Sequence, residues 1–279
     1  MKFLALILPI ILILAACSSI EKKAETAAPA EVKPALPQSL EEAVKSPYRT
    51  EANRARDPYR HPLETLTFFG MTPDMTVVEI TPSAGWYTEI LAPFLAEKGH
   101  YIAAVNKVPN AEHDQQNQKL SAWLSTHPDA GSKVTFTTFM PPKEVDIAPP
   151  GTADLVLTFR NVHNWSSKHN EKAAFSALFK ALKPGGILGV VEHRANASKH
   201  ADGKSGYVRE KEVISYAKRA GFKLVDRSEI NANPKDTKDY PKGVWALPPS
   251  LQGDAQEREK YLAIGESDRM TLKFQKPKK

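Results

Sequence analysis

Two short segments of the sequence concentrate side chains that can accept or hold a proton. Arg160 and His163 stand in "FRNVHNW", and His193 follows Glu192 in "EHR". Imidazole titrates near neutral pH, so either histidine can act as a general base toward a hydroxyl or amine substrate. Our candidate catalytic residues are therefore His163, His193 and Arg160. The alternative is that His163 packs a loop and that Glu192 and His193 belong to a surface ion cluster.

Each of these segments ends an apolar run that predicts a β-strand, at residues 153–159 and 187–193. In open α/β sheets, ligands bind beyond the carboxyl ends of the strands. If the two strands are neighbours, both segments lie on one rim of the sheet. Trp165 would then flank a planar acceptor, unless it packs the loop instead.

Histidine clusters can also bind a metal ion. His163 with His169, and His193 with His200, lack the short spacing of helical metal pairs, so we predict no metal site. Glu192 and His193 can nevertheless join His163 in space, which leaves a metal as an open alternative.

Predicted strands and helices alternate along most of the chain. Strands are expected at residues 75–80, 100–106, from 133, 153–159, 187–193, from 222 and from 269. Helices are expected from Ser39 and at about 62–69, 85–98, 111–125, 168–182 and 210–220. This alternation predicts a parallel sheet with helices on both faces. The last strand follows the sixth without a clear helix, so we expect an antiparallel edge or insertion, with one buried and one solvent-exposed face.

The first sixteen residues, "MKFLALILPIILILAA", carry Lys2 ahead of an apolar run, which is typical of an export signal. "LAAC", ending at Cys17, resembles the lipobox of bacterial lipoproteins. That resemblance implies a signal peptide at 1–16 and a lipidated Cys17, whose acyl chains would anchor the protein to the membrane. Ser18 then implies the periplasmic face of the outer membrane in the cell envelope. The alternative is an uncleaved N-terminal helix.

The rest of the chain divides by composition. Residues 17–45 are rich in Ala, Pro and Glu and predict a flexible tether, followed by one domain at 46–279. Within it, residues 231–268 form a long inserted loop, where Trp245 is a candidate substrate contact. The net charge of +6 is spread among nearly as many acids, so we predict no nucleic-acid partner.

Four motifs in order, "RDPYRHPLETLTFFG", "GWYTEILAPFL", "FRNVHNW" and "LKPGG", resemble the class I S-adenosylmethionine-dependent methyltransferases. They look like a bacterial group of predicted exported methyltransferases. The resemblance covers about residues 46–277. It implies a doubly wound, Rossmann-like sheet of seven strands, mostly parallel, with an antiparallel last strand. It also implies S-adenosylmethionine as cofactor and methyl transfer to a small-molecule acceptor of unknown identity.

The family's first motif reads acid-x-Gly-x-Gly-x-Gly, and this chain offers Glu79, Thr81, Ser83 and Gly85 in that register. Glycine suits such a turn because a Cβ obstructs close approach and left-handed backbone, and β-branched Thr81 departs most. Asn106 stands where the family usually has an acid that binds the ribose. The cofactor-binding residues implied by the resemblance are Glu79, Thr81, Ser83, Gly85, Asn106, Phe159 and Arg160.

N-terminal helices of this fold often cover the cofactor. Tyr59, Arg60 and His61 are therefore candidates for a lid, with a helix cap and a solvated arginine as the alternative. A protein of another class is also compatible with the sequence. It would be a catalytically degenerate lipoprotein that keeps the methyltransferase fold as a ligand-binding or scaffolding module.

Overall fold

The structure is a computed structural model that describes residues 34–107, 110–197 and 203–278. The predicted signal peptide, Cys17 and most of the predicted tether lie outside the described residues. Among the helices that the structure describes, none is both long and apolar enough to cross a membrane.

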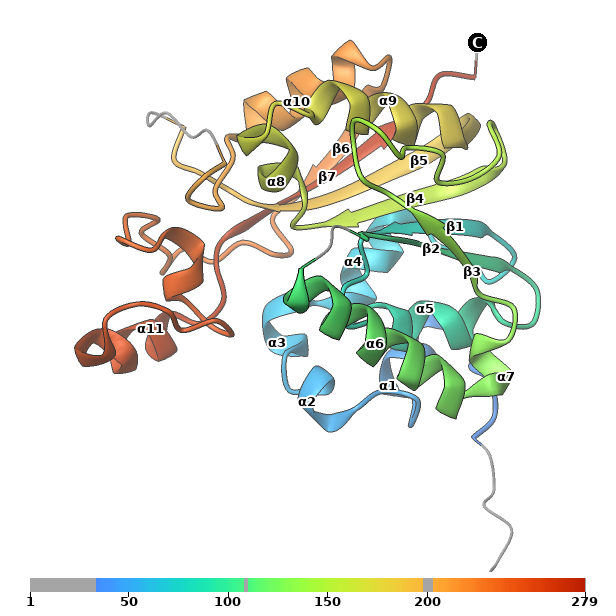
Figure 1. Cartoon of the computed structure of the whole chain (residues 1–279), viewed down its shortest axis with the longest axis horizontal. Coiled ribbons are helices and arrows are strands. Elements are labelled where there is room, and N and C mark those ends of the chain that lie inside the picture. Colours follow the sequence, from blue (N-terminus) through green and yellow to red (C-terminus); the bar gives the residue numbers. More distant parts are fainter. Residues whose placement is uncertain (1–33, 108–109, 198–202, 279) are drawn as a thin grey trace, which may run out of the picture. The chain divides into compact units, whose positions relative to one another are not determined.

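Seven strands form one sheet in the order β3-β2-β1-β4-β5-β7-β6 (Figure 1). They are β1 (Thr76–Ile80), β2 (His100–Val105), β3 (Thr135–Thr138), β4 (Ala153–Phe159), β5 (Leu182–His193), β6 (Lys223–Ser228) and β7 (Arg269–Gln275). The first five pair in parallel, whereas β7 runs antiparallel to both β5 and β6. The predicted α/β fold, mostly parallel with an antiparallel last strand, is confirmed.

Helices cover both faces of the sheet (Figure 1). One face carries α1 (Leu40–Lys45), α4 (Pro62–Phe69), α5 (Thr88–Leu95) and α6 (Ala111–Thr126), and the other carries α8 (Val162–Ser167), α9 (Glu171–Ala181) and α10 (Glu210–Arg219). The short helices α2 (Glu51–Arg54), α3 (Asp57–Arg60) and α7 (Pro128–Gly131) complete the first set. Successive residues of a strand point to opposite faces, which gives the molecule two apolar cores.

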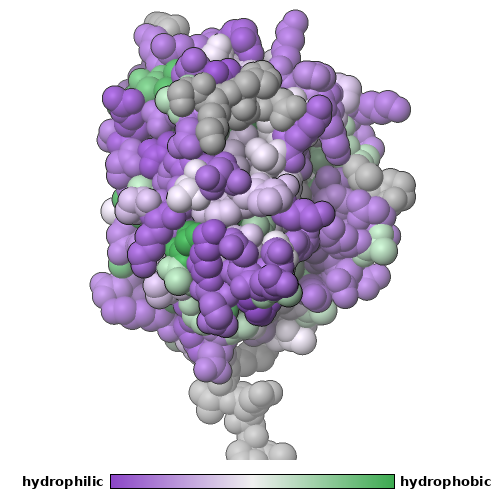
Figure 2. All heavy atoms as spheres, turned by 90° about the vertical axis from the view of Figure 1, so that its left-hand side faces the viewer, coloured by the Kyte–Doolittle hydropathy of each residue, from purple (hydrophilic) through white to green (hydrophobic). Residues whose placement is uncertain are grey.

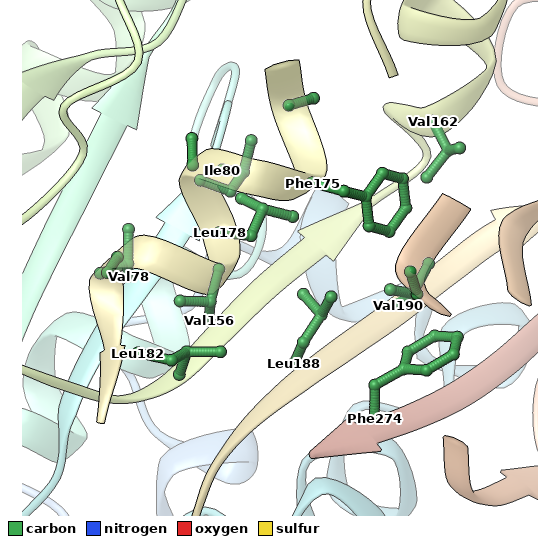
Figure 3. Packing of buried hydrophobic residues seen from close by; sticks show 14 of the residues in the cluster. Val78, Ile80, Val156, Val162, Phe175, Leu178, Leu182, Leu188, Val190 and Phe274 are labelled. Atoms are coloured by element: carbon green, nitrogen blue, oxygen red, sulfur yellow. The ribbon is translucent and has the colours of Figure 1, made fainter. Parts of the chain in front are cut away.

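The core under α9 shows how the pattern works. Phe175 and Leu178, three positions apart on α9, point at the sheet and meet Val156 of β4 and Val190 of β5 (Figure 3). All four side chains are fully buried. On the opposite face, Leu157 of β4 packs in the second core with α4 and α5. The central strands are thus apolar on both faces, as parallel strands covered by two helical layers require.

The structure differs from the prediction at three elements. The last strand was expected to have one solvent-exposed face, but β7 is buried on both faces over Arg269–Leu272 because it lies inside the sheet and α4 packs on it. The polar edge strand is β6 instead. The region from 162 contains a separate short helix, α8, and β5 begins at Leu182, five residues earlier than predicted.

Residues 34–45, which the sequence analysis assigned to the tether, belong to the compact unit Pro34–Lys279. Ser39 caps α1 by accepting the Glu42 N–H, and Ala43 of that helix is fully buried. The inserted segment 231–268 is also ordered over its length, with two short 3₁₀ helices, η1 (Gly243–Ala246) and η2 (Ala255–Glu257), and the helix α11 (Arg258–Ile264).

Candidate functional site

The loop that follows β1 keeps the backbone of a glycine-rich turn without its glycines. Thr81, Ser83 and Gly85 all have left-handed backbone, with φ of 52°, 54° and 90°. For a residue with a side chain this conformation costs about 1–2 kcal/mol. A Cβ at Gly85 would lie 3.0 Å from Leu120 Cδ1. The loop therefore has the backbone geometry that glycine usually provides. Thr81 and Ser83 adopt this geometry at a cost in conformational energy, and such strain is common at binding sites.

A cavity of about 480 Å³ opens beside this loop, at the carboxyl ends of the parallel strands. Thr81 and Ser83 form part of its wall but do not fill it, and Asn106 at the end of β2 faces the same space. The volume falls within the range of small-molecule sites, roughly 300–1,000 Å³. Figure 2 looks onto this side of the molecule, whose surface is mostly hydrophilic.

Arg160, the first residue after β4, also has left-handed backbone, with φ of 61°. It lines the 480 Å³ cavity and a second cavity of about 270 Å³, whose walls also share Thr81, Ser83 and Phe159. Phe159 stacks on Tyr87 with ring centroids 3.7 Å apart. The residues carried over from the resemblance thus converge on one edge of the sheet, as predicted from the strand ends.

Glu79 is buried under this loop and lines the smaller cavity. Its Oε2 accepts the hydroxyl of Tyr101 at 2.6 Å and that of Thr88 at 3.4 Å. Burial raises the pKa of Glu79 to about 7, although these hydrogen bonds and the charge of Arg160 act to lower it. The carboxyl group therefore changes charge near neutral pH. Tyr101 and Thr88 could not be assigned from the sequence, because the pairing of β1 with β2 brings Tyr101 to Glu79 and the packing of α5 on the sheet brings Thr88.

His163 begins the second polar group and is buried on α8. Its Nδ1 lies 3.0 Å from Oε1 of Glu192, and its backbone N–H donates to Oε2 of the same carboxylate at 3.2 Å. A carboxylate at Nδ1 favours the tautomer in which Nδ1 carries the proton, so Nε2 is left as a proton acceptor. His163 lines the larger cavity, which makes this imidazole the base best placed to act on a ligand there.

His193 lies beside it at the end of β5, with ring centroids 5.5 Å apart, and lines the same cavity. Its Nδ1 is 2.5 Å from Ser267 Oγ. Burial, with the charges of His163 and Arg160, lowers the pKa of His193 well below its usual range, so this ring is neutral at physiological pH. The adjacency of the two segments follows from the pairing of β4 with β5. The role of Glu192 as the partner of His163, rather than as part of a surface ion cluster, needed the structure because Glu192 is fully buried.

Potential metal-ligating atoms of His163, Glu192 and His193 lie within 4.8 Å of one another, so the alternative left open by the sequence has a geometric basis. The charges nearby oppose it. Arg160, Arg269 and Arg60 all act on His193 to disfavour its cationic form, and they would disfavour a dication at the same place. Glu192 is also already engaged by His163 and by the N–H of His193 at 2.7 Å. We keep the prediction of no metal here.

The aromatic candidates divide between the cavity and the core. Trp245 of η1 lines the larger cavity and meets His163 edge-on, with ring centroids 6.1 Å apart. Trp165 also lines it but is mostly buried, edge-on to Phe139 and Phe175. The inserted segment therefore supplies one wall of the cavity.

The predicted lid is only partly assembled. Arg60 is buried and lines the smaller cavity, but Tyr59 and His61 line a different one with Asn231. The reason is local. His61 joins α3 to α4 in a left-handed conformation, with φ of 41°, and this turn separates the neighbouring side chains. Of the three lid candidates, only Arg60 lines the smaller cavity, and its burial excludes the solvated alternative for this residue, while the lid role of all three stays a prediction.

Comparison with solved structures places this arrangement among known folds. A SAM-dependent methyltransferase from Aquifex aeolicus aligns with a TM-score of 0.54 and 16% identity, over 85% of this chain and 98% of that one. The protein named StiE O-MT aligns with a TM-score of 0.52 and 17% identity, over 85% and 81% of the two chains. The chain has the class I methyltransferase fold. No protein-family model and no curated protein matches it.

The same fold also carries other chemistry. The [4+2]-cyclase SpnF aligns with a TM-score of 0.53 and 15% identity, over 84% of this chain and 86% of that one. At such identities the likeness concerns the fold, and function has to be argued from the site.

Proposed function

We propose that the chain is an S-adenosylmethionine-dependent methyltransferase acting on a small-molecule acceptor. The observation that carries this proposal is the open cavity beside the β1 loop, where Thr81 and Ser83 keep left-handed backbone at the glycine positions. Glu79 lies below that loop and Asn106 lies at its side, so the residues present fit the cofactor. Thr81 and Ser83 leave the cavity open although neither is glycine.

S-adenosylmethionine would supply an electrophilic methyl group that an acceptor lone pair takes while the S–C electron pair stays on sulfur. The protein then has to align the acceptor and receive its proton. His163 accepts that proton at Nε2, and Glu192 holds the imidazole through Nδ1 and stabilises the cation that forms. Trp245 bounds the space in front of His163 and can pack against a planar acceptor.

Titration calorimetry tests the cofactor step. S-adenosylmethionine and S-adenosylhomocysteine should each give saturable heat with the wild-type protein. Glu79→Ala should abolish it, because this variant lacks the carboxylate that would hold the cofactor's ammonium group. Glu229→Ala is the matched control, since the Glu229 side chain is 67% exposed and pairs with Arg194. No heat from either compound with the wild-type protein would refute the proposal.

A second candidate is a ligand-binding or scaffolding module that has lost catalysis. Two observations favour it: the strained Thr81 and Ser83 in place of glycines, and Asn106 in place of the acid that usually binds ribose. Such a protein would bind S-adenosylhomocysteine weakly or not at all, and it would show no methyl transfer either with His163 or in the His163→Ala variant.

We further propose that the protein is anchored to the periplasmic face of the outer membrane through a lipidated Cys17. The support is the placement of "LAAC" directly after the apolar leader. Metabolic labelling with a fatty acid should mark the wild-type protein and not a Cys17→Ser variant. Equal labelling of both would exclude lipidation at Cys17.

A further inference from the structure

Four arginine side chains gather around one carboxylate beside the β1 loop. Arg56 Nε lies 2.7 Å from Oε1 of Glu266, and Arg60 Nε and Arg269 Nη2 each lie 3.3 Å from its Oε2. Arg160 acts on the same carboxylate through its charge. Burial alone would raise the pKa of Glu266, but the four guanidinium groups hold it at about 2. Glu266 is therefore ionised at physiological pH.

This arginine cluster, defined as Arg56, Arg60, Arg160 and Arg269, carries more positive charge than its partner can balance. Glu266 forms ion pairs with three of the four guanidinium groups, and the charge of Asp268, which is itself paired with Arg194 and Lys238, also acts on Arg269. The cluster still keeps an excess of positive charge. Burial, followed by the charge of Arg160, lowers the pKa of Arg60 well below its usual range. Burying unpaired charge is costly unless a counter-ion compensates it. The excess therefore calls for an anion from outside the chain.

Several donors of the cluster are left without a partner. Within the described residues, Nη2 of Arg56 and Nη2 of Arg60 are buried and make no hydrogen bond. The guanidinium of Arg160 also has no hydrogen bond to any described residue. Arg49 behaves differently, since its Nη1 and Nη2 bind Asp57 at 2.6 and 2.7 Å. Arg49 is thus a structural arginine whose two Nη atoms are paired and whose Nε alone lacks a partner, whereas Arg56 and Arg60 each keep an unpaired Nη2.

The arginine cluster borders a cavity large enough for a ligand group. Arg56, Arg60 and Arg160 line the smaller cavity of about 270 Å³, together with Trp86 and Tyr87. The guanidinium of Arg60 lies over the ring of Trp86, 4.6 Å from its centroid, which holds the side chain in place. Arg60 is only 2% exposed, so it is not a solvated cation.

We propose that Arg56, Arg60 and Arg160 bind the carboxylate or phosphate group of a ligand in this cavity. Guanidinium groups match the geometry of both anions and bind them through paired N–H donors. The anion would satisfy the free donors and offset the excess charge. It can come from the amino-acid end of an S-adenosylmethionine-type cofactor or from a separate anionic small molecule. The site itself does not require that the protein transfer a methyl group.

Inorganic phosphate is the probe for the site. Titration of the full-length wild-type protein with phosphate at low ionic strength should give saturable binding. Arg160→Gln should weaken it about tenfold or more, as loss of roughly 1.4 kcal/mol of binding free energy requires. Arg60→Gln should weaken it similarly. Because Arg160 makes no side-chain hydrogen bond to any described residue, its variant should fold even if Arg60→Gln does not.

Arg227→Gln is the matched control, because Arg227 is 69% exposed and pairs with Glu210 at 3.3 Å. It should bind phosphate like the wild type. Equal phosphate affinity in wild type, Arg160→Gln and Arg227→Gln would overturn the proposal, as would the absence of phosphate binding to the wild type.

A competition experiment separates the two sources of the anion. Displacement of phosphate by S-adenosylhomocysteine, but not by 5′-methylthioadenosine, which lacks the carboxylate, would assign the site to the cofactor. Phosphate that stays bound at saturating S-adenosylhomocysteine would assign it to a separate anionic ligand. Either outcome supports the anion site. If the cofactor proposal alone fails, phosphate still binds and S-adenosylhomocysteine does not.

Discussion

The Nδ1 atom of His163 lies 3.0 Å from Oε1 of Glu192, and both side chains are buried at the rim shared by β4 and β5. The pair resembles the histidine–carboxylate units that hold an imidazole in one tautomer. Whether the protein is an enzyme or a binding module, this hydrogen bond fixes which nitrogen of His163 faces the cavity. It leads to the first prediction.

Glu192→Leu should change the tautomer of His163. In the wild-type protein, long-range ¹H–¹⁵N NMR should show the proton on Nδ1, and the variant should populate the Nε2–H form. His127 is an internal control, since its Nδ1 lies 2.8 Å from the Trp123 carbonyl oxygen, far from Glu192 in sequence. An Nδ1–H signal that persists for His163 in the variant would mean that Glu192 does not set the tautomer.

His163→Ala should separate binding from catalysis once an acceptor is found. Loss of a general base lowers kcat by roughly 10²- to 10⁴-fold, while the Kd for S-adenosylhomocysteine should stay within about twofold because His163 binds the acceptor side. Single-turnover methyl transfer measures the first quantity and calorimetry the second. A normal kcat in this variant would remove His163 from the mechanism.

Ionisation of Glu79 should lower the free energy of unfolding as the pH rises. Its pKa is about 7 in the folded protein against 4.5 in the unfolded chain, so the folded state binds the extra proton between these values. The free energy of unfolding should therefore fall by about 3 kcal/mol between about pH 4.5 and about pH 8 from this group alone. Urea unfolding across this range measures the slope, which Glu79→Gln should flatten. An unchanged slope in that variant would show that Glu79 is ionised throughout.

Thr81→Gly and Ser83→Gly should each relieve strain in the β1 loop. Glycine removes the cost of left-handed backbone but loses more entropy on folding, so the net gain in unfolding free energy should be up to about 1 kcal/mol. If the two side chains crowd the cavity, S-adenosylhomocysteine should also bind more tightly. Gly85→Ala is the opposing control, because its φ is 90° and a Cβ would meet Leu120 at 3.0 Å. The Gly85→Ala substitution should therefore destabilise the protein.

Glu266→Gln should destabilise the protein and make it responsive to anions. Removing one partner of a buried ion pair costs about 3–5 kcal/mol, here because four arginines lose their shared carboxylate. Phosphate should restore part of the loss in thermal unfolding. Asp57→Asn is the matched control. It also removes the carboxylate that pairs with a buried arginine, Arg49, but in the wild-type protein both Nη atoms of Arg49 are already paired with Asp57. Phosphate should not rescue that variant, and equal rescue of both would point to a non-specific salt effect.

Much of the fold follows from local sequence patterns. β1 and β4 are short apolar runs bounded by polar or turn residues, and their predicted limits differ from the structure by one residue at most. α8 was missed because its six residues, which include His163 and Trp165, are too few to show a helical period. The prediction that one face of β7 is exposed was wrong. The alternation of apolar and polar residues along β7 describes the side chains, but it does not show whether the strand lies at the edge or inside the sheet.

Only the part of the site that is built from residues at the ends of strands could be predicted from the sequence. His163 and His193 meet because β4 and β5 are parallel neighbours, and a topology rule was enough for that. The arginine cluster was not predictable in the same way. Arg56 and Arg60 lie about 200 residues from Glu266 and Arg269 in the chain, at separations of 210 and 206 for the two ion pairs with Glu266. No local pattern marks such long-range partners.

The position of β7 constrains when this protein can finish folding. Among the strands of the described residues, β6 pairs only with β7, which consists of Arg269–Gln275 and follows β6 by some forty residues in the chain. Until those residues are available, one edge of β5 is uncovered and β6 has nothing to dock on. The same segment brings Glu266 and Arg269 into the ion-pair cluster around Arg60. Completion of the sheet and pairing of the charges around Arg60 therefore depend on the same segment, and a chain that stopped before Glu266 would lose both.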